Sequence, residues 1–394
     1  MTGRTGAGMR VALVLGPSTG GIGVHVRDLA AYCVGRGDRV VVAGPAQTGE
    51  RFGFGEVGAR FVPLPTSLAT GGLRLRRVIA GADVVHSHGL RAAALTNLAR
   101  AALPAPVRHV VTLHNAVLAD GVRGRVSGLV ERLAIRPADL VFGASADLVG
   151  RAHLLGARRA EFRAVPAPPL PEPGRRREAS RAELGVPQDA ALVLAVGRLA
   201  PQKSYSLLLD AVAELTAPDG APPRRAFPPP PPSPAQPPSA REVPQVRVLI
   251  AGDGPEAAGL GARIEELALP VTLLGRREDV ADLLAAADVF VLCSRWEARA
   301  LVVQEALRAG TPVVATAVGG IPGLVGDAAV LVPWNDPRAL AAALREVLTD
   351  EALRAELRRA GPARAAAWPG RAEALEKIRA EYTGRIPPRP RRDR

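Results

Sequence analysis

Two cations lie close together on one loop, Gly197–Ser204, and their types suit a phosphorylated ligand. Arg198 and Lys203 are five residues apart and follow the apolar run Leu192–Val196, which predicts a buried parallel β-strand. Open parallel sheets bind ligands at the carboxyl ends of their strands. Arg can hold a diphosphate through paired hydrogen bonds, and Lys adds a point charge. The loop is not a P-loop, because Gln202 stands where that motif requires glycine.

Two glutamates eight residues apart, Glu297 and Glu305, have the chemistry to bind sugar hydroxyls. Glu297 follows the predicted strand Val289–Leu292, and Glu305 falls in the next predicted helix. An ionised carboxylate there can accept two hydrogen bonds from a vicinal diol such as ribose. Acidic pairs are usually surface charge, but this pair lies in the mostly apolar segment 294–310. We therefore interpret it as a candidate site.

A glycine-rich turn, Gly16–His25, follows the first predicted strand. Glycines between a strand and a helix let the backbone approach a phosphate at the helix N-terminus. A dinucleotide fingerprint fits poorly, because Val26 occupies a glycine position and the strand Arg39–Val42 runs into Gly44 without supplying an acid for ribose. A phosphate-binding turn and a purely structural turn both stay open.

The elements that must position these residues alternate between strands and helices in both halves of the chain. Short apolar runs predict strands at Val11–Leu15, Arg39–Val42, Asp83–His86, His109–Leu113, Leu140–Gly143, Leu192–Val196, Val246–Ala251, Val271–Leu274, Val289–Leu292, Val313–Ala315 and Ala329–Val332. Helical patterns cover His25–Gly35, Arg91–Ala102, Gly128–Leu133, Tyr205–Leu215, Pro255–Glu266, Asp279–Ala286, Val302–Ala309, Arg338–Leu348 and Arg371–Tyr382. This alternation predicts an α/β protein with two doubly wound parallel sheets.

The length of 394 residues favours two domains. We expect a first domain at 9–170, a linker at 171–186, a second domain at 187–368, a helix at 369–384 and a basic tail at 385–394. Residues 166–181 are rich in Pro, Arg and Glu without periodicity, which indicates an exposed connection. Eight prolines between 228 and 238 predict a loop insertion, 217–243. A docking site for a proline-recognising partner is the alternative reading of that insertion.

The charge of the chain limits its partners. A net charge of +13 attracts anions, but aromatic residues make up only 3% of the chain, so the stacking platforms of nucleic-acid binders are not expected. Anionic small molecules and acidic lipid surfaces fit better. Arg123, Arg125, Arg132 and Arg136 surround the apolar Leu129–Leu133, which predicts peripheral contact with an acidic membrane surface. An ordinary solvated helix is the alternative.

Cysteine content and hydropathy indicate a cytoplasmic protein. The two cysteines make a disulfide framework or a thiolate metal cage very unfavourable. No apolar run reaches the ~18 residues of a membrane-spanning helix. The first eight residues lack the apolar block of a signal peptide.

Six groups of residues, taken in chain order, resemble the motifs of the GT-B glycosyltransferases of family 4. They are Gly20–Gly23 followed by His25; Asp83–Gly89; Thr112–Asn115; Gly197–Arg198 with Lys203; Gly252–Pro255; and Glu297 with Glu305, followed by Ala309–Val314 and Gly319–Gly320. The resemblance runs from Arg10 to about Trp368. It implies a GT-B architecture, in which two Rossmann-like domains face a central cleft, the first on the acceptor side and the second binding a nucleotide sugar.

The resemblance also implies roles for individual residues. The catalytic group would be Arg198, Lys203, Glu297 and His114. Donor binding would fall to Gly20, Gly21, Gly275, Arg276, Arg299, Ala300, Leu301 and Glu305. The acceptor side would hold Gly23, His25, His88 and Asn115.

The implied reaction is a retaining transfer of a hexose from a UDP- or GDP-linked sugar to an acceptor hydroxyl on a lipid or glycan. The family needs no divalent metal, and the sequence contains no Asp-x-Asp. No cofactor is expected, because the nucleotide sugar is a co-substrate. Two alternatives stay open: transfer of the N-acetylglucosaminyl type to a soluble inositol phosphate, and a non-catalytic nucleotide-sugar-binding interaction protein.

Two positions depart from the family pattern. Ser204 stands where glycine is common, and Ala298-Arg299-Ala300-Leu301 stands where Gly-x-Pro-Leu is common. The second departure falls at the implied contacts with the donor sugar, so the identity of that sugar is left open.

Overall fold

The computed structural model describes residues 8–18, 20–65, 67–117, 121–217 and 245–384. They form two compact units. Unit 1 comprises the residues up to Ala167 together with those from Pro369 onward, and unit 2 runs from Pro168 to Trp368. The expected basic tail 385–394 lies outside the described residues. The expected insertion 217–243 also lies outside them, except for residue 217.

Unit 1 is built on a seven-stranded parallel sheet with the order β3-β2-β1-β4-β5-β6-β7. Its strands are β1 Arg10–Leu15, β2 Arg39–Gly44, β3 Arg60–Pro63, β4 Val84–His88, β5 Arg108–Leu113, β6 Leu140–Gly143 and β7 Ala160–Phe162. The strand order reverses between β1 and β4, where doubly wound sheets bind ligands. Leu15 of β1 pairs in register with His88 of β4, so the carboxyl ends of these two strands lie side by side.

Helices cover both faces of the unit 1 sheet. They are α1 Gly21–Gly35, α2 Ala46–Phe52, α3 Leu68–Ile79, α4 Leu90–Ala101, α5 Gly121–Ile135 and α6 Ala146–Leu154, with a short 3₁₀ turn, η1, at Phe54–Val57. Alternate residues of β1 enter different cores: Leu13 packs with α1, while Val14 packs with α3 and α4. Burial on both faces explains why the strand reads as a continuous apolar run.

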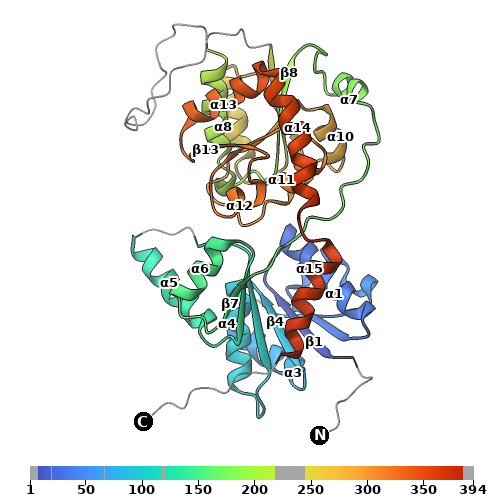
Figure 1. Cartoon of the computed structure of the whole chain (residues 1–394). Coiled ribbons are helices and arrows are strands. Elements are labelled where there is room, and N and C mark those ends of the chain that lie inside the picture. Colours follow the sequence, from blue (N-terminus) through green and yellow to red (C-terminus); the bar gives the residue numbers. More distant parts are fainter. Residues whose placement is uncertain (1–7, 19, 66, 118–120, 218–244, 385–394) are drawn as a thin grey trace. The chain divides into compact units, whose positions relative to one another are not determined.

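The last helix of the chain, α15 Arg371–Ala380, belongs to unit 1 and lies beside α1 (Figure 1). The short 3₁₀ turn η3, Glu381–Thr383, follows it. Leu375, Ile378 and Tyr382 are buried in the same core as α1. A charged contact adds to this apolar one, because Nε of Arg379 donates to the buried Asp38 at 2.7 Å. Helix α15 and the turn η3 are therefore an integral part of the first sheet domain.

Unit 2 repeats the architecture with a six-stranded parallel sheet of order β10-β9-β8-β11-β12-β13. Its strands are β8 Ala191–Val196, β9 Val246–Ala251, β10 Val271–Gly275, β11 Val289–Leu292, β12 Val313–Thr316 and β13 Val330–Val332. Its helices are α7 Arg177–Glu183, α8 Tyr205–Leu215, α9 Ala257–Glu266, α10 Val280–Ala286, α11 Leu301–Arg308, α12 Ile321–Val325, α13 Pro337–Thr349 and α14 Glu351–Ala366, with the 3₁₀ turn η2 at Pro201–Lys203. The expected fold class, two doubly wound Rossmann-like α/β domains, is confirmed.

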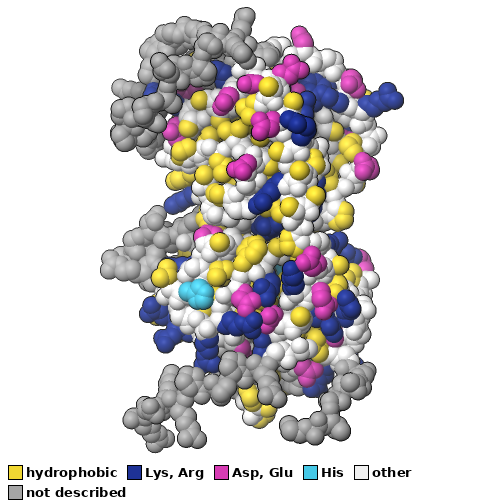
Figure 2. Space-filling model, in the orientation of Figure 1, with side chains coloured by type: hydrophobic (Ala, Val, Ile, Leu, Met, Phe, Trp, Pro, Cys, Tyr) yellow, Lys and Arg dark blue, Asp and Glu magenta, His cyan; other side chains and the backbone are white. Residues whose placement is uncertain are grey.

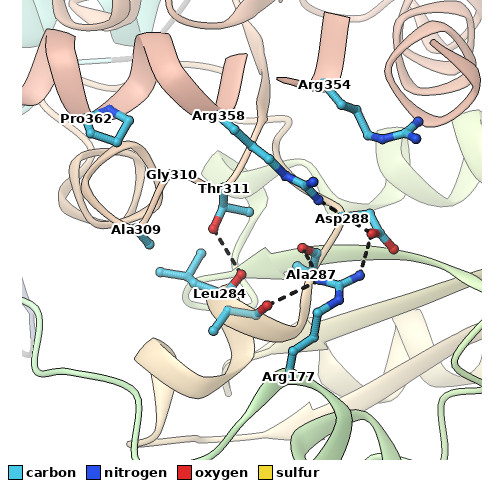
Figure 3. A pocket seen from close by; sticks show the side chains of 11 residues that line it. Arg177, Leu284, Ala287, Asp288, Ala309, Gly310, Thr311, Arg354, Arg358 and Pro362 are labelled. Carbon is cyan, nitrogen blue, oxygen red and sulfur yellow. Dashed lines mark hydrogen bonds and ion pairs between the residues drawn. The ribbon is translucent and has the colours of Figure 1, made fainter. Parts of the chain in front are cut away.

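Within the connection expected at 166–181 and the linker expected at 171–186, most of residues 169–179 are exposed, but the segment also contains a helix with a buried side. Residues 177–183 form α7, and Arg181 is only 1% exposed. Its guanidinium donates to the carbonyl oxygen of Ala286 and pairs with Asp288, both at 3.2 Å. Arg177 reaches Asp288 and the carbonyl of Ala287 from the same helix (Figure 3). Arginine can be buried when its donors are matched in this way, so an Arg-rich stretch is a poor indicator of a linker.

Candidate active site

The cation loop and the first glutamate of the acidic pair meet at the carboxyl edge of the unit 2 sheet. Nζ of Lys203 lies 2.6 Å from Oε1 of Glu297, and the hydroxyl of Ser294 donates to the same oxygen at 2.9 Å. The side chains of the ion pair are 18% and 11% exposed, so solvent screens them little. Because β8 and β11 are neighbours in the sheet, the loops that follow them are neighbours too.

Further hydrogen bonds fasten these two loops together. The amide of Arg295 donates to the carbonyl of Gln202 at 2.8 Å, and the Gln202 side-chain amide donates to the carbonyl of Trp296 at 2.8 Å. The buried thiol of Cys293 donates to the carbonyl of Lys203 at 3.2 Å, and burial raises its pKa to about 12. Gln202, which replaces the P-loop glycine, therefore anchors the cation loop instead of cradling a phosphate.

The amino-acid composition of the chain also distinguishes Lys203 from the other basic residues. It is one of only two lysines among 51 basic residues, the other being Lys377. A chain that otherwise uses arginine keeps an ammonium group at this loop. A compact point charge with three donors does what a planar guanidinium cannot do in the same space.

Two glycines after β9 let the loop that carries Arg198 pack closely. A Cβ on Gly252 would lie 1.9 Å from the carbonyl oxygen of Gly197, and one on Gly254 would lie 2.3 Å from that of Leu199. Real Cβ atoms do not approach backbone oxygens so closely, so any side chain there must displace the loop. The motif Gly252–Gly254 is thus a support beneath the Arg198 loop.

Glycines after β12 support Glu297 in a similar way. Gly319 has φ +52°, and a Cβ on it would lie 2.2 Å from the carbonyl oxygen of Glu297. The amide of Gly320 donates to that same carbonyl at 2.8 Å. The Gly319–Gly320 pair therefore fixes the backbone from which the Glu297 carboxylate extends.

The backbone conformation at Ser204 explains why glycine is common at this position in the family pattern. It has φ 51° and ψ 43°, a left-handed conformation that glycine adopts at no steric cost. Its hydroxyl accepts a hydrogen bond from Nε1 of Trp334 at 3.2 Å. That contact compensates in part for the unfavourable backbone.

Two further cations are expected here: Arg198, on the same loop as Lys203, and Arg276, on the loop after β10. Arg198 is exposed, and in the part of the chain that the structure describes its guanidinium forms no hydrogen bond or ion pair. Arg276 follows β10, with its side chain 62% exposed and 3.3 Å from Glu278. The amide of Gly252 donates to the carbonyl of Gly275 at 2.7 Å, which joins the loops after β9 and β10.

Glu305 lies within α11 and is partly buried. Burial raises the pKa of its carboxyl, and the positive charge of Arg308 opposes that effect. Among the described residues its side chain accepts no hydrogen bond, and it does not touch the Lys203–Glu297 pair. A partly desolvated carboxylate without donors is a natural acceptor for ligand hydroxyls.

The segment Arg299–Leu301 leads into α11, with Ala300 at the N-cap position and Leu301 as the first helical residue. The Arg299 guanidinium packs over Trp368, 5.5 Å from the ring centre. Burial, and then the nearby charges of Arg364 and Arg308, lower the pKa of Arg299 to about 10. Its Nε is buried without a hydrogen-bond partner.

In unit 1 the structure brings together three histidines that the resemblance places near the transferred sugar or the acceptor. Nδ1 of His88 lies 3.1 Å from Nε2 of His114. The ring centre of His25 lies 5.5 Å from that of His114 and 5.7 Å from that of His88. All three side chains are nearly buried, and Nε2 of both His25 and His88 has no hydrogen-bond partner.

A fourth histidine connects this cluster to the C-terminal segment. Nδ1 of His86 lies 2.7 Å from the hydroxyl of Tyr382, and its Nε2 lies 2.7 Å from the hydroxyl of Thr112. The ring of His86 lies 4.2 Å from that of His88, centre to centre. His86 is thus satisfied by side-chain hydroxyls rather than by backbone groups, and no local pattern in the sequence indicates that Tyr382 reaches it.

Burial keeps the histidine cluster neutral. It lowers the pKa of His25 to about 4, with a smaller contribution from the positive charge of Arg371. Burial also lowers the pKa of His86, His88 and His114 well below the usual value. A neutral imidazole carries one donor and one acceptor, so His25 and His88, whose Nε2 atoms have no partner, can pair with sugar hydroxyls.

The glycine-rich turn begins α1, with Gly20 as its N-cap and Gly21 as its first residue. A Cβ on Gly23 would lie 2.0 Å from the ring of Phe52, so this glycine serves packing. Its amide donates to the hydroxyl of Ser18 at 3.0 Å. Asn115, directly after His114, is exposed.

One hollow of about 710 Å³ lies elsewhere, at the amino ends of β11 and β12 (Figure 3). It is lined by Arg177, Leu284, Ala285, Ala287, Asp288, Ala309, Gly310, Thr311, Arg354, Arg358 and Pro362. None of the expected site residues borders it. Within the described ranges, no group of three or more His, Cys, Asp or Glu side chains is arranged to hold a metal ion.

Solved structures share this architecture. HepE of Anabaena with UDP and glucose is 21% identical, with a TM-score of 0.76 and coverage of 95% of this chain and 99% of that one. WaaG, a glycosyltransferase of lipopolysaccharide biosynthesis, is 18% identical, with a TM-score of 0.69 and coverage of 95% and 100%. The fold is therefore that of the GT-B glycosyltransferases.

Sequence comparison identifies the family. The family described as "Glycosyl transferases group 1" matches residues 176–364, and a "Glycosyl transferase 4-like domain" matches residues 20–168. A D-inositol 3-phosphate glycosyltransferase of Kineococcus radiotolerans is 34% identical over 333 residues, 75% of this chain and 71% of that protein. Proteins of the same description from Nocardioides sp. and Streptomyces coelicolor are 33% and 34% identical over 70% and 67% of this chain, which spans 61% of their length. The chain therefore belongs to the family of glycosyltransferases that contain these two domains.

Proposed function

We propose that this protein is a retaining, metal-independent glycosyltransferase that moves a hexose from a nucleotide diphosphate sugar to an acceptor hydroxyl. The observation that carries the proposal is the partly buried contact of Lys203 with Glu297 at the carboxyl edge of the unit 2 sheet. Stability of the fold does not require an ammonium group and a carboxylate at this edge of the sheet. A donor substrate accounts for both, because its diphosphate pairs with the ammonium group and its sugar hydroxyls pair with the carboxylate.

The donor diphosphate is held by Arg198 and Lys203. Lys203 uses one of its three donors on Glu297, which leaves two for phosphate oxygens. The exposed Arg198 adds a guanidinium on the same loop. Positive charge fixed in advance stabilises the leaving diphosphate as its negative charge develops.

The carboxylates and the neutral imidazoles bind sugar hydroxyls. Glu305 accepts from the ribose diol, and Glu297 contacts the transferred hexose through Oε2, since Oε1 is engaged by Lys203 and Ser294. In unit 1, the neutral imidazole of His114 is proposed to bind a sugar hydroxyl. Glu297 therefore both orients the ammonium group of Lys203 and binds the transferred sugar.

The reaction is an exchange of one bond for another at the anomeric carbon. The acceptor oxygen attacks on the face that the leaving group occupies, and the bond from that carbon to the diphosphate oxygen breaks. The proton of the acceptor hydroxyl passes to the departing phosphate oxygen. No protein base is required, and the configuration of the sugar is retained.

Several acceptors are compatible with this chemistry. A lipid or a glycan hydroxyl is the first candidate. Transfer to a soluble inositol phosphate is a second, supported by relatives described as D-inositol 3-phosphate glycosyltransferases. The donor is a UDP- or GDP-linked sugar, and the likeness to a UDP- and glucose-bound fold supports UDP.

The proposal is tested with a panel of UDP- and GDP-sugars and the purified full chain. Thermal shift identifies the donor, because a ligand that binds the folded state raises its apparent stability. Slow release of nucleotide diphosphate then distinguishes an enzyme from a protein that only binds. Turnover that persists in EDTA, with a product of the donor's anomeric configuration, supports the mechanism; binding without release in any donor and acceptor mixture contradicts it.

We further propose that unit 1 contacts an acidic membrane surface through the outer faces of α3, α4 and α5. Five apolar side chains are exposed there: Leu73, Leu98, Leu129, Val130 and Leu133. Leu98 connects them, because it lies against Gly72 of α3 while its neighbour Asn97 donates to the carbonyl of Leu133 on α5 at 3.2 Å. An apolar surface rimmed by basic residues suits the interface of an anionic bilayer.

The charges on this surface are of one sign. Arg74, Arg76, Arg77 and Arg132 are exposed, whereas Glu131 is the single acid in these three helices and is buried against Arg151. Figure 2 shows one face of the molecule, on which basic and acidic side chains are interspersed. Among the described helices none is long and apolar enough to span a membrane, so the proposed contact is peripheral.

Vesicle sedimentation tests this contact. The chain should bind phosphatidylcholine vesicles that contain phosphatidylglycerol and leave vesicles of phosphatidylcholine alone, and salt should weaken the binding. Leu129→Ser with Leu133→Ser should reduce it. Leu154→Ser, which alters an exposed leucine of α6 outside the surface, is the matched control. Equal binding by both variants, or none to anionic vesicles, contradicts the proposal.

A further inference from the structure

The hollow at the amino ends of β11 and β12 lies at the edge of the unit 2 sheet opposite to the candidate active site (Figure 3). Asp288 directly precedes β11, whereas Glu297 follows the carboxyl end of the same strand. The volume of about 710 Å³ falls within the range of roughly 300–1,000 Å³ that is usual for small-molecule sites. The hollow is therefore large enough for a ligand and separate from the Lys203–Glu297 pair.

Three arginines from two helices line this hollow. Arg177 extends from α7, and Arg354 and Arg358 extend from α14. Residues four apart lie on the same face of a helix, so the two guanidiniums of α14 share one wall. Asp288 is the single acid of the described lining, and Figure 3 shows Arg177 and Arg358 reaching toward it from different helices. The lining thus has an excess of two positive charges.

The carboxylate of Asp288 is satisfied without the arginines of α14. Its Oδ1 accepts from Arg177 at 2.5 Å, and its Oδ2 accepts from Arg181 at 3.2 Å and from the amide of Leu192 at 2.8 Å. Arg358 approaches Asp288 only to 4.0 Å, which is the outer limit of an ion pair. The positive charge of α14 is therefore not needed to neutralise this acid.

The two guanidiniums of α14 keep most of their donors for a ligand. Nη1 of Arg354 donates to the carbonyls of Val347 and Leu348, at 3.0 and 2.6 Å. Among the residues that the structure describes, Nε and Nη2 of Arg354 form no hydrogen bond or ion pair, and Arg358 forms no hydrogen bond. The planar fork of a guanidinium matches the oxygens of a phosphate group.

Close packing holds the wall that carries these arginines. Gly310 has φ +70°, and a Cβ on it would lie 3.3 Å from the carbonyl oxygen of Arg358 and 3.7 Å from Cγ of Pro362. Glycine at this position therefore lets α14 lie close to the end of α11. The hydroxyl of Thr311 donates to the carbonyl of Leu284 at 3.0 Å, which joins the same turn to α10 (Figure 3).

An apolar floor completes the hollow. It consists of Leu284, Ala285, Ala287, Ala309 and Pro362. A single inorganic phosphate would leave most of the volume, and all of this floor, to water. A ligand with an organic part covers the floor and gains from the burial of its apolar surface.

We propose that this hollow binds a small phosphate monoester, whose phosphate pairs with Arg354 and Arg358 and whose organic part lies on the apolar floor. Arg177 has a supporting role, because its bond to Asp288 offsets the one negative charge that would repel the phosphate. None of the residues assigned to the donor or the acceptor takes part. The site is therefore a function beyond the proposed transfer reaction.

Titration calorimetry on the full chain tests this site, with inorganic phosphate, phenyl phosphate and phenol as probes. Phenyl phosphate should bind at least about tenfold more tightly than inorganic phosphate, because its ring buries apolar surface. It should also bind at least about tenfold more tightly than phenol, which cannot form the charge-assisted hydrogen bonds. Equal affinity for the two phosphates would show that free phosphate is the ligand, and the absence of binding by either would remove the site.

A variant of α14 locates the phosphate. Arg358→Gln removes one charge from an exposed side chain without a close partner, so the fold should persist. The affinity for phenyl phosphate should fall about tenfold, because a charge-assisted hydrogen bond is lost. Arg359→Gln is the matched control, since Arg359 is an exposed arginine of the same helix outside the lining. Equal losses in the two variants would contradict the assignment.

A second variant tests the hollow through its volume. Ala309 lines the hollow and is exposed, so Ala309→Trp places a large ring there without entering the core. Binding of phenyl phosphate should be abolished, while circular dichroism shows that the fold persists. Ala355→Trp, at an exposed position of α14 outside the lining, should leave binding unchanged. Binding that survives Ala309→Trp would overturn the proposal.

The candidate donor site also attracts phosphates, and Lys203→Ala distinguishes the two sites. Phenyl phosphate should bind Lys203→Ala as tightly as the unmodified chain. Loss of binding in Lys203→Ala, together with full binding in Arg358→Gln, would place the anion at the donor loop and overturn the inference. These measurements use no sugar donor, so their outcome is independent of that of the proposed transfer.

Discussion

Lys203 and Glu297 stand 94 residues apart in the chain, yet the ammonium nitrogen of one lies 2.6 Å from a carboxylate oxygen of the other. Neither residue is held by this contact alone. Glu297 also accepts from Ser294, and the carbonyl of Lys203 accepts from Cys293. The pair is therefore built into two loops whose backbones are bonded together.

Removal of the ammonium group should abolish most transfer while the fold persists. Lys203→Ala should lower kcat/KM for transfer by about 10²–10³, the effect of deleting one fixed group that stabilises developing negative charge. The steady-state rate with the identified donor measures it. Lys377→Ala removes the other lysine, which pairs with Glu373 on the surface of α15, and should leave the rate unchanged. Full activity in Lys203→Ala would remove our assignment of the diphosphate site.

Neutralisation of Glu305 should lower the affinity for the donor without lowering the stability of the protein. Burial raises the pKa of this carboxyl, so its ionised form is disfavoured in the folded state and Glu305→Gln should leave stability unchanged or slightly higher. Donor affinity should fall roughly 10- to 100-fold, because hydrogen bonds to a charged acceptor are lost. Titration calorimetry with the donor, compared with Glu346→Gln on the exposed face of α13, distinguishes the two effects. Unchanged donor affinity would exclude Glu305 from the site.

A single methyl group on Gly252 should damage both stability and donor binding. Its Cβ would lie 1.9 Å from the carbonyl oxygen of Gly197, so the Arg198 loop must shift. We expect a loss of about 1–3 kcal/mol in the free energy of unfolding, the usual range for overpacking. Gly259→Ala is the matched control: no atom would meet its Cβ, and alanine within α9 should add roughly 0.5–1 kcal/mol. Urea denaturation measures the free energy of unfolding of both variants.

Acid should destabilise unit 1 through its histidines. Their folded-state pKa values lie below the unfolded value near 6.5, so the unfolded chain binds more protons as the pH falls. Stability is fully present above that value and is lost as the pH falls toward about 4, the folded pKa of His25. Each unit of difference contributes about 1.4 kcal/mol per group.

Unfolding free energies between pH 7 and pH 5 measure this slope. His25→Gln should flatten it, and His153→Gln, which alters the exposed histidine of α6, should not. A slope that is the same in His25→Gln as in the unmodified chain would show that His25 does not titrate in this way.

The sequence predicts the strands that are buried on both faces and two of the four edge strands of the described sheets, β10 and β13. Strands such as β1 and β8 are covered on both faces, so they read as continuous apolar runs. The edge strands β3 and β7 were missed because they are short and half-exposed. The helix α14 escaped notice because its surface is charged and it contains Pro362. Local patterns follow burial, and these elements are only partly buried.

For the candidate site, residue types and spacing indicated the loops but not their contacts. Arg198, Lys203 and Glu297 stand out because charges follow apolar strands. Nothing local shows that Gln202 binds the backbone of Trp296, or that Tyr382 reaches His86 from the end of the chain. Such contacts join residues about 90 to 300 positions apart, and only the folded chain defines them.

The place of α15 has a consequence for synthesis. Because Leu375, Ile378 and Tyr382 complete the core around α1, the amino-terminal sheet domain cannot complete its core until these residues have been translated. The ribosome releases all of unit 2 first, so the earlier half waits for a segment made hundreds of residues later. A stop codon just before α15 would therefore leave the amino-terminal domain without part of its interior.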